Sequence, residues 1–397
     1  MANVSSSNGL EKRPKLRFPG FDEPWKMVSL QDISEYRKNK ICVSKLKYIS
    51  TENMLQNFAG IIPYTSEEDI SGVEFCVGDT LLANIRPYLR KAWLATHDGA
   101  CSTDVLALCP LDITPAFLNN IIEQDRFIDY VMSGVKGSKM PRGDKAHILA
   151  YETAIPSLLE QEKINSFMQL LHQRIAKIQM EIELLKKYKR GLVSQILKQR
   201  LAISHEDDEW KEVCLSDVAE GFEYGLNAAA TTYDGKHKYI RITDIDDDTH
   251  AYINQDPVSP SGAFEERYRV RENDILFART GASVGKSYLY RKNDGDLFFA
   301  GFLIRIHVKE GVDGEYVFLN TLTEEYDKWV LLESARSGQP GINAEQYRKY
   351  RFKLPSLNTQ RRIATIARNI DVQIQKEALH LRLLQKQKAG LLQQLFI

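Results

Sequence analysis

The stretch that decides the fold is Ile155–Leu197, IPSLLEQEKINSFMQLLHQRIAKIQMEIELLKKYKRGLVSQIL, because the same stretch returns at the end of the chain. Shifted by 199 positions, it aligns without a gap with Leu354–Phe396, LPSLNTQRRIATIARNIDVQIQKEALHLRLLQKQKAGLLQQLF. Identical residues run through the whole alignment, among them Pro156/Pro355, Gln161/Gln360, Ile164/Ile363, Leu185/Leu384, Lys189/Lys388 and Gly191/Gly390. Such self-similarity at a fixed spacing indicates an internal duplication.

Each copy predicts one long helix. A proline at the start of each copy ends the preceding segment, and the serine that follows it is a possible helix cap. Apolar residues then return every three or four positions, which is typical of a coiled-coil seam. They are Ile164, Phe167, Leu171, Ile175, Ile178, Ile182, Leu185, Leu192 and Ile196 in the first copy, and Ile363, Ile366, Ile370, Ile374, Leu381, Leu384, Leu391 and Leu395 in the second.

A narrow apolar stripe needs a partner to cover it. The favoured partner is the other copy, lying antiparallel in the same chain and relating the two halves by a pseudo-twofold axis. The alternative is that each helix packs only on its own domain.

The duplication extends beyond the helices to a globular block before each of them. Asp22–Ile33, DEPWKMVSLQDI, is echoed by Asp208–Val218, DEWKEVCLSDV. The fold class predicted is α+β, with two globular α/β domains that are separated and followed by long helices forming an intramolecular antiparallel coiled coil. The predicted boundaries are a flexible tail at 1–20, a first domain at 21–155, a central helix at 156–201, a second domain at 202–354 and a C-terminal helix at 355–397.

Cognate positions within the two blocks carry unlike loops. Val73–Leu82 and Tyr268–Phe277 each predict a strand, a turn and a second strand. The residues that follow are ANIRPYLRK in the first block and ARTGASVGKS in the second. Similar scaffolds therefore support different loops.

The amino-acid composition does not identify a binding partner. The 397 residues include 53 Lys and Arg and 53 Asp and Glu, so the net charge neither indicates nor excludes nucleic acid. The five cysteines are odd in number and form no CxxC pair, which is typical of reduced thiols. We expect a cytoplasmic protein, since no signal peptide and no 18-residue apolar run is evident.

An ordered set of short motifs points to a family. They are Phe18–Trp25, Asn84–Tyr88, Cys101–Asp104, Lys136–Arg142, Ile155–Gln161, Tyr239–Ile245, Arg279–Gly281, Ser337–Gly338 and Ile342–Asn343. With them and the duplication, the chain resembles the DNA specificity subunits of type I restriction-modification systems over essentially its whole length beyond the tail.

The resemblance implies a non-catalytic subunit with two target recognition domains. Each domain would read one half of a bipartite double-stranded DNA target, and the helices would act as a ruler that sets the spacer. The implied partners are two modification subunits, which bind S-adenosylmethionine and methylate adenine, and restriction subunits that use ATP to translocate and cleave DNA. No cofactor and no membrane is expected for this chain itself.

Base reading requires planar or bidentate side chains at loop tips, with Lys, Ser and Thr on phosphates. In the first domain the candidate DNA-binding residues are Asn84, Arg86, Tyr88, Arg90, Lys91, Ser102, Thr103, Lys136, Lys139 and Arg142. In the second domain they are Arg241, Thr243, Arg279, Thr280, Ser283, Lys286, Arg336, Ser337, Gln339 and Asn343. An ordinary solvated side chain is the competing interpretation for any one of them.

Two other functions are weighed against DNA reading. A coiled-coil scaffold or decoy that binds methyltransferase subunits would keep the helices but need no basic loops. A nucleotide-binding enzyme would need a P-loop, but Gly281–Ser287, GASVGKS, has one residue too few between its glycines. The eight histidines are scattered without metal-ligand spacing, so neither a metal site nor a catalytic site is predicted.

Overall fold

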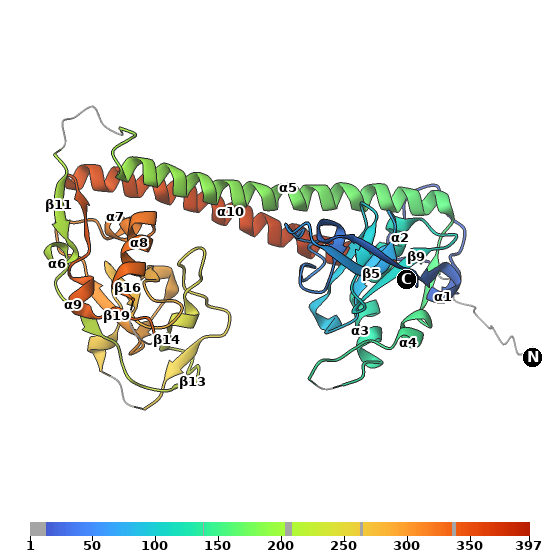
Figure 1. The fold of residues 1–397 in the computed structure, drawn as a ribbon, viewed down its shortest axis with the longest axis horizontal. Helices are drawn as coiled ribbons and strands as arrows, with labels where there is room; N and C mark the ends of the chain where they lie inside the picture. The colour runs from blue at the N-terminus through green and yellow to red at the C-terminus, as the bar shows by residue number, and fades with distance from the viewer. Residues whose placement is uncertain (1–12, 138, 203–208, 263–264, 336–338) are drawn as a thin grey trace, which may run out of the picture. The chain divides into compact units, whose positions relative to one another are not determined.

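A computed structural model describes residues 13–137, 139–202, 209–262, 265–335 and 339–397 (Figure 1). The chain divides into two compact units. Unit 1 comprises residues 1–179 and 379–397, and unit 2 comprises residues 180–378. Each unit therefore takes part of both long helices, α5 (Leu158–Leu197) and α10 (Leu357–Leu395).

The globular part of unit 1 places short strands before a cluster of helices. Its four-stranded sheet has the order β2-β9-β6-β7, and a second sheet has the order β3-β5-β8-β4. The elements are β1 (Lys26–Ser29), α1 (Leu30–Ile33), β2 (Ser34–Tyr36), β3 (Lys40–Ser44), β4 (Tyr48–Ile49), β5 (Asp69–Phe75), β6 (Thr80–Ala83), β7 (Ala92–Leu94), β8 (Gly99–Cys101), β9 (Val105–Pro110), α2 (Pro115–Ile122), α3 (Asp125–Ser133), α4 (Lys145–Leu149) and β10 (Glu152–Ile155).

Unit 2 repeats this arrangement with a four-stranded sheet of order β12-β19-β16-β17. The strand pairs β13-β15 and β14-β18 stand beside it. The elements are β11 (Lys211–Cys214), α6 (Leu215–Val218), β12 (Glu223–Tyr224), β13 (Ala230–Thr232), β14 (Lys238–Ile240), β15 (Val258–Pro260), β16 (Asp274–Ala278), β17 (Ser287–Leu289), β18 (Leu297–Phe299), β19 (Leu303–His307), α7 (Gly314–Asn320), α8 (Glu324–Glu333), α9 (Ala344–Tyr347) and β20 (Arg351–Leu354).

The strand that leads into each long helix pairs with the first strand of the same globular block. β1 pairs antiparallel with β10, placing Lys26 opposite Ile155, and β11 pairs antiparallel with β20, placing Lys211 opposite Leu354. The two echoing stretches of sequence are therefore equivalent in structure. The predicted α+β class and the duplication of a globular block followed by a helix are confirmed.

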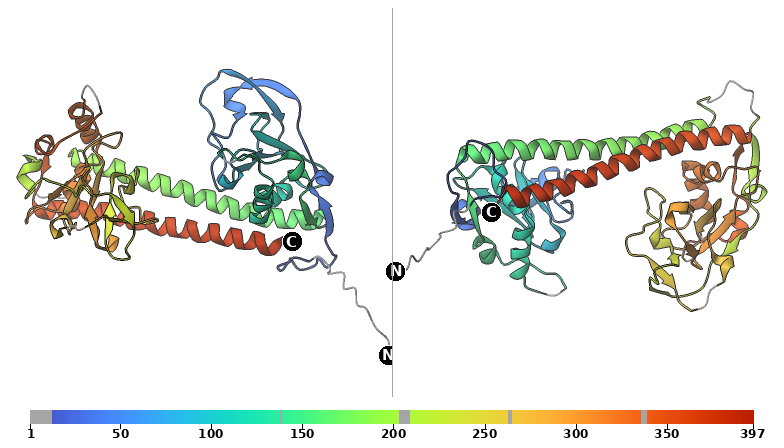
Figure 2. Two further views of the ribbon diagram at one scale, coloured as in Figure 1. Left: turned by 90° about the horizontal axis from the view of Figure 1, so that it is seen from below. Right: turned by 180° about the vertical axis from the view of Figure 1, so that it is seen from behind.

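Within each unit, a segment of α5 lies beside a segment of α10 and runs in the opposite direction (Figures 1 and 2). In unit 1, Ile164 and Met168 of α5 share one core with Leu392 and Leu395 of α10. In unit 2, the shared core contains Val193 and Ile196 of α5 with Ile363 and Ala367 of α10. Because both helices contribute to both cores, the alternative in which each packs only on its own domain is wrong.

A buried glutamine ties the start of each long helix to a short helix of its own unit. Gln161 accepts a hydrogen bond from the Thr114 backbone N–H at 2.9 Å and donates to the Pro156 carbonyl at 3.1 Å. Gln360 makes the same two bonds, with Asp313 N–H at 2.9 Å and the Pro355 carbonyl at 2.8 Å. Each amide thus satisfies backbone groups that would otherwise be orphaned at the ends of helices.

Two sequence predictions need correction. The predicted tail extends to residue 20, but Leu16 donates its backbone N–H to the Gln394 carbonyl at 2.9 Å, and Arg17 forms an ion pair with buried Glu160 at 2.8 Å. The first predicted strand of Tyr268–Phe277 is absent as well. A 3-10 turn at Glu266–Tyr268 precedes a single bridge at Arg269, whose side chain bonds back to Glu266 and stabilises the turn.

We predict that Ile363→Ala lowers the unfolding free energy of the chain by about 2–5 kcal/mol, because it removes a fully buried side chain from the core that both helices share. Leu383→Ala is the matched control, since Leu383 is 57% exposed on the same helix. Denaturant titration followed by circular dichroism measures both. Equal losses for the two variants would contradict the burial of the seam.

Candidate nucleic-acid interface

In unit 1, the candidate DNA-binding residues come from three segments of the chain, which meet just beyond the buried strand β6. We call this region the unit 1 crossing; its described residues are 84–91, 102–104, 136–137 and 139–143. It is held by main-chain hydrogen bonds: Asn84 N–H to Asp104 O at 2.8 Å, Arg86 N–H to Pro141 O at 2.8 Å and Gly143 N–H to Asn84 O at 3.1 Å. Segments far apart in sequence therefore present their side chains together.

Unit 2 has an equivalent crossing beyond β16, comprising residues 279–286, 300–303 and 339–343. Its bonds match those of unit 1: Arg279 N–H to Phe302 O at 3.1 Å, Gly281 N–H to Pro340 O at 3.0 Å and Ile342 N–H to Arg279 O at 2.9 Å. Position 279 thus corresponds to position 84, and position 302 to position 104. The candidates Arg336 and Ser337 lie outside the described residues.

The Gly-rich stretch of unit 2 is a turn between two paired strands. β16 and β17 are antiparallel, with Phe277 opposite Ser287, and the Gly285 N–H donates to the Ala278 carbonyl at 2.9 Å. A P-loop instead feeds a helix. This stretch lies between two strands, and the spacing argument against a P-loop agrees with that position.

Several candidate cations already have acidic or carbonyl partners. Lys91 donates to the Thr51 carbonyl at 2.7 Å, and Lys286 donates to the Ile245 carbonyl at 3.0 Å and pairs with Asp247. The other ion pairs are Arg90–Asp125 at 2.8 Å, Lys136–Asp144 at 2.5 Å, Arg142–Asp104 at 3.0 Å and Arg241–Asp244 at 2.7 Å. These pairs hold the loops in shape, and a DNA phosphate would have to compete with the carboxylates.

Three candidate cations have neither a carboxylate nor a carbonyl partner within the described part of the chain: Arg86, Lys139 and Arg279. Arg86 is exposed and has a left-handed backbone, with φ of 51°. Such a conformation is uncommon outside glycine and tends to persist where function requires it. These three side chains are the ones most available to a new anionic or base-edge partner.

The uncharged candidates differ in how accessible they are. Asn84 is only 9% exposed, and its Oδ1 is buried without a hydrogen-bond partner among the described residues, as is the Oγ of Ser102. Asn343 caps α9 by accepting from the Gln346 N–H at 2.9 Å. Thr280 and Ser283 are half-buried, and the exposed candidates are Thr103, Thr243, Gln339 and Tyr88.

Sequence reasoning missed two residues at the unit 2 crossing. The Tyr224 ring lies under the guanidinium of Arg279, 4.9 Å from ring centroid to Cζ. Phe302 is 59% exposed, although its backbone carbonyl accepts from Arg279. Aligning residues 100–105 with 298–303 would have placed Phe302 opposite Asp104, but Tyr224 has no comparable signal in the sequence.

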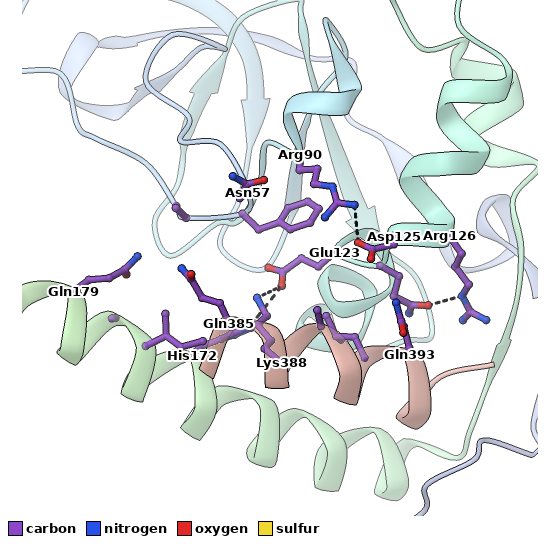
Figure 3. Close-up of a pocket in the computed structure, with 18 of the residues that line it drawn as sticks. Asn57, Arg90, Glu123, Asp125, Arg126, His172, Gln179, Gln385, Lys388 and Gln393 are labelled. Atoms are coloured by element: carbon purple, nitrogen blue, oxygen red, sulfur yellow. Dashed lines mark hydrogen bonds and ion pairs between the residues drawn. The ribbon is translucent and has the colours of Figure 1, made fainter. Parts of the chain in front are cut away.

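Unit 1 also contains a pocket of about 780 Å³ between the loop at residues 57–60, the end of α2 and both long helices (Figure 3). Glu123 is buried in it and receives hydrogen bonds from Lys388 of α10 at 2.6 Å and from Asn119 at 2.9 Å. His172 of α5 lies 3.5 Å from the same carboxylate. Figure 3 shows Glu123, His172 and Lys388 converging from the end of α2, from α5 and from α10.

Burial by itself would raise the pKa of Glu123. The nearby His172 and the charge and hydrogen bond of Lys388 outweigh it and lower the pKa to about 2. The carboxylate is therefore ionised in the folded chain. Its pairing contributes stability above its unfolded pKa of about 4.3, and that contribution is lost as the pH falls toward 2.

We predict that Lys388→Met destabilises the chain by about 3–5 kcal/mol at neutral pH, because it leaves a buried carboxylate without its cation. This destabilisation should shrink as the pH falls, because the pKa of Glu123 rises without its cation and the carboxyl then takes up a proton in the folded variant. Lys186→Met is the matched control, since it breaks the pair with Glu183, which is 71% exposed. Identical acid-unfolding curves for the wild type and Lys388→Met would contradict this account.

Comparison with known proteins shows what this chain is similar to. Residues 207–382 match the family described as Type I restriction modification DNA specificity domain. The match covers unit 2 from its first strand and runs into α10, and it confirms the resemblance on which the sequence prediction rested.

A relative and two solved structures agree with this specificity family. The type I restriction enzyme EcoDI specificity subunit of Escherichia coli is 30% identical over 91 residues, which are 23% of this chain and only 20% of that protein. The type I restriction-modification S subunit from M. genitalium aligns over 97% of this chain and 99% of its own, with a TM-score of 0.58 and 14% identity. A structure from work on the assembly and conformational transition of the type I R-M system aligns over 95% and 98%, with a TM-score of 0.56 and 17% identity. At such identities the structures show a shared fold.

Within the described ranges, no helix is long and apolar enough to cross a membrane. Nor does any group of three or more His, Cys, Asp or Glu in that part of the chain form a candidate metal site.

Proposed function

We propose that the chain is the DNA-reading subunit of a type I restriction-modification complex, with each unit reading one half of a bipartite double-stranded target. The observation that carries the proposal is the pair of equivalent crossings. Their main-chain hydrogen bonds correspond one to one, while the side chains at matching positions differ, as Asn84 and Arg279 do. One framework with two sets of side chains suits two different half-sites.

The candidate residues divide by role in this proposal. Arg86 and Arg279, which have no carboxylate partner among the described residues, would reach base edges, where arginine donates to guanine O6 and N7. Lys139, Lys136, Arg142, Lys286 and the hydroxyls of Thr103, Thr243, Thr280 and Ser283 would contact phosphates, which fix register without reading sequence. Asn84 would need to turn outward to read adenine, because its Oδ1 is buried.

We infer that this chain has no catalytic centre of its own and that chemistry belongs to its partners. The proposed partners are two modification subunits, carrying S-adenosylmethionine, and ATP-dependent restriction subunits, in the cytoplasm. Apart from the tail, the domain boundaries predicted from the sequence belong to the same proposal, with the globular parts as target recognition domains and the two long helices as the spacer ruler.

Methylome mapping tests the central proposal. We predict that co-expression with the cognate modification subunit methylates adenines in a two-part motif with a fixed gap, detected by single-molecule sequencing of the host genome. Omitting the chain should abolish the motif. Binding of the modification subunit without any new methylated motif would instead favour the scaffold or decoy function.

The ruler has its own test. Inserting four helical residues after Gln179 in α5 and after Ala378 in α10 adds about 6 Å to each helix. Since DNA rises about 3.4 Å per base pair, we predict a motif whose gap is one or two base pairs longer while both half-sites are unchanged. The same insertion at the exposed loop after Gly235 is the control and should leave the gap as it was. An unaltered gap in the helix variant would exclude the ruler.

A further inference from the structure

Arg279 differs from the other arginines of unit 2 that have been considered for DNA binding. Arg241 is held by both oxygens of Asp244, at 2.8 and 2.7 Å, so its guanidinium is already engaged. Arg279 has no carboxylate partner within the described residues, and its Nε is buried without a hydrogen bond there. Its side chain is instead held by an aromatic ring.

That ring belongs to Tyr224, at the end of β12. The Arg279 Cζ lies 4.9 Å from the ring centroid, within the range of a cation–π contact. The Tyr224 hydroxyl accepts a hydrogen bond from the Ala344 N–H at 3.2 Å, at the start of α9. The ring is therefore fixed at both ends, by its own strand β12 and by α9, which directly follows the crossing.

The backbone of Arg279 is fixed too. Its N–H donates to Phe302 and its carbonyl accepts from Ile342, so main-chain bonds hold both sides of the residue. An aromatic platform orients a guanidinium without occupying its terminal N–H donors, whereas a carboxylate would occupy them. The terminal donors of Arg279 thus keep their capacity for a bidentate acceptor.

We propose that Tyr224 is a positioning residue that holds Arg279 ready to read a guanine through O6 and N7. This inference rests on the proposed function, since it presupposes that the unit 2 crossing meets DNA bases. The inference adds that the specificity for one half-site depends on a residue of β12, which is not among the loop residues predicted from the sequence to bind DNA. Tyr224 is 43% exposed and belongs to none of the apolar cores, so its replacement should not unfold the unit.

The test uses the complex of the full chain with its modification subunit and duplexes of the mapped target. Each base pair of both half-sites is varied in turn, and binding is measured by competition. Arg279→Ala should reduce discrimination at one G·C pair by roughly 5- to 150-fold. Tyr224→Leu should reduce discrimination at that same pair by about 2- to 5-fold, the range of an exposed cation–π contact. Tyr224→Phe keeps the ring and should restore most of the difference.

Two controls separate positioning from simple loss of structure. Phe222→Leu removes a comparable stack under Arg348, at 4.5 Å and two residues away, and should leave both half-sites unchanged. In the double variant Arg279→Ala/Tyr224→Leu, the loss should equal that of Arg279→Ala alone, because Tyr224 acts through Arg279.

The possible outcomes separate a failure of the positioning role from a failure of the proposed DNA-reading function. If Arg279→Ala reduces discrimination at one base pair and Tyr224→Leu does not, the positioning role is overturned while DNA reading stands. The same holds if the two losses of discrimination add in the double variant. If Tyr224→Phe discriminates no better than Tyr224→Leu, the ring stack is overturned as well. If Arg279→Ala leaves every base pair unchanged, the base-reading function assigned to this crossing fails.

Discussion

The narrow apolar stripe of the two long helices is the constraint on which the rest of the structure depends. A single helix of this kind is not stable in water, because most helical stability in proteins comes from burying such a face. Here each unit covers part of both stripes with its own core residues, as Phe117 does in unit 1 and Tyr316 in unit 2. Neither core would be complete without turns from both helices.

The buried glutamines transmit this constraint to the globular parts. Gln161 and Gln360 bond the first turn of a long helix to the start of α2 or α7. In each unit a buried inner strand of the four-stranded sheet, β6 or β16, leads directly into the crossing. In each unit, an unbroken series of packed elements thus connects the helices to the residues proposed to read DNA.

Much of this could be predicted from the sequence, because periodicity and repetition are local signals. The helix starts just after Pro156 and Pro355 and the duplication both depend on spacing alone. Ion pairing could not be predicted in the same way. Arg90 meets Asp125 and Arg142 meets Asp104 across long stretches of chain, so their engagement appears only in the folded structure. The tail assignment was too long for the same reason, because Arg17 finds Glu160 far along the sequence.

The way the crossings are held has an evolutionary consequence. The main-chain hydrogen bonds that join their segments are common to both units; any residue can supply the carbonyl and any residue except proline the N–H, whereas side-chain ion pairs such as Arg142–Asp104 belong to one unit. Asp104 and Phe302 occupy matching places in the two units although one is charged and the other aromatic. Mutational drift at these tips would therefore cost little folding stability, so a lineage could acquire new recognition preferences while its scaffold stays intact.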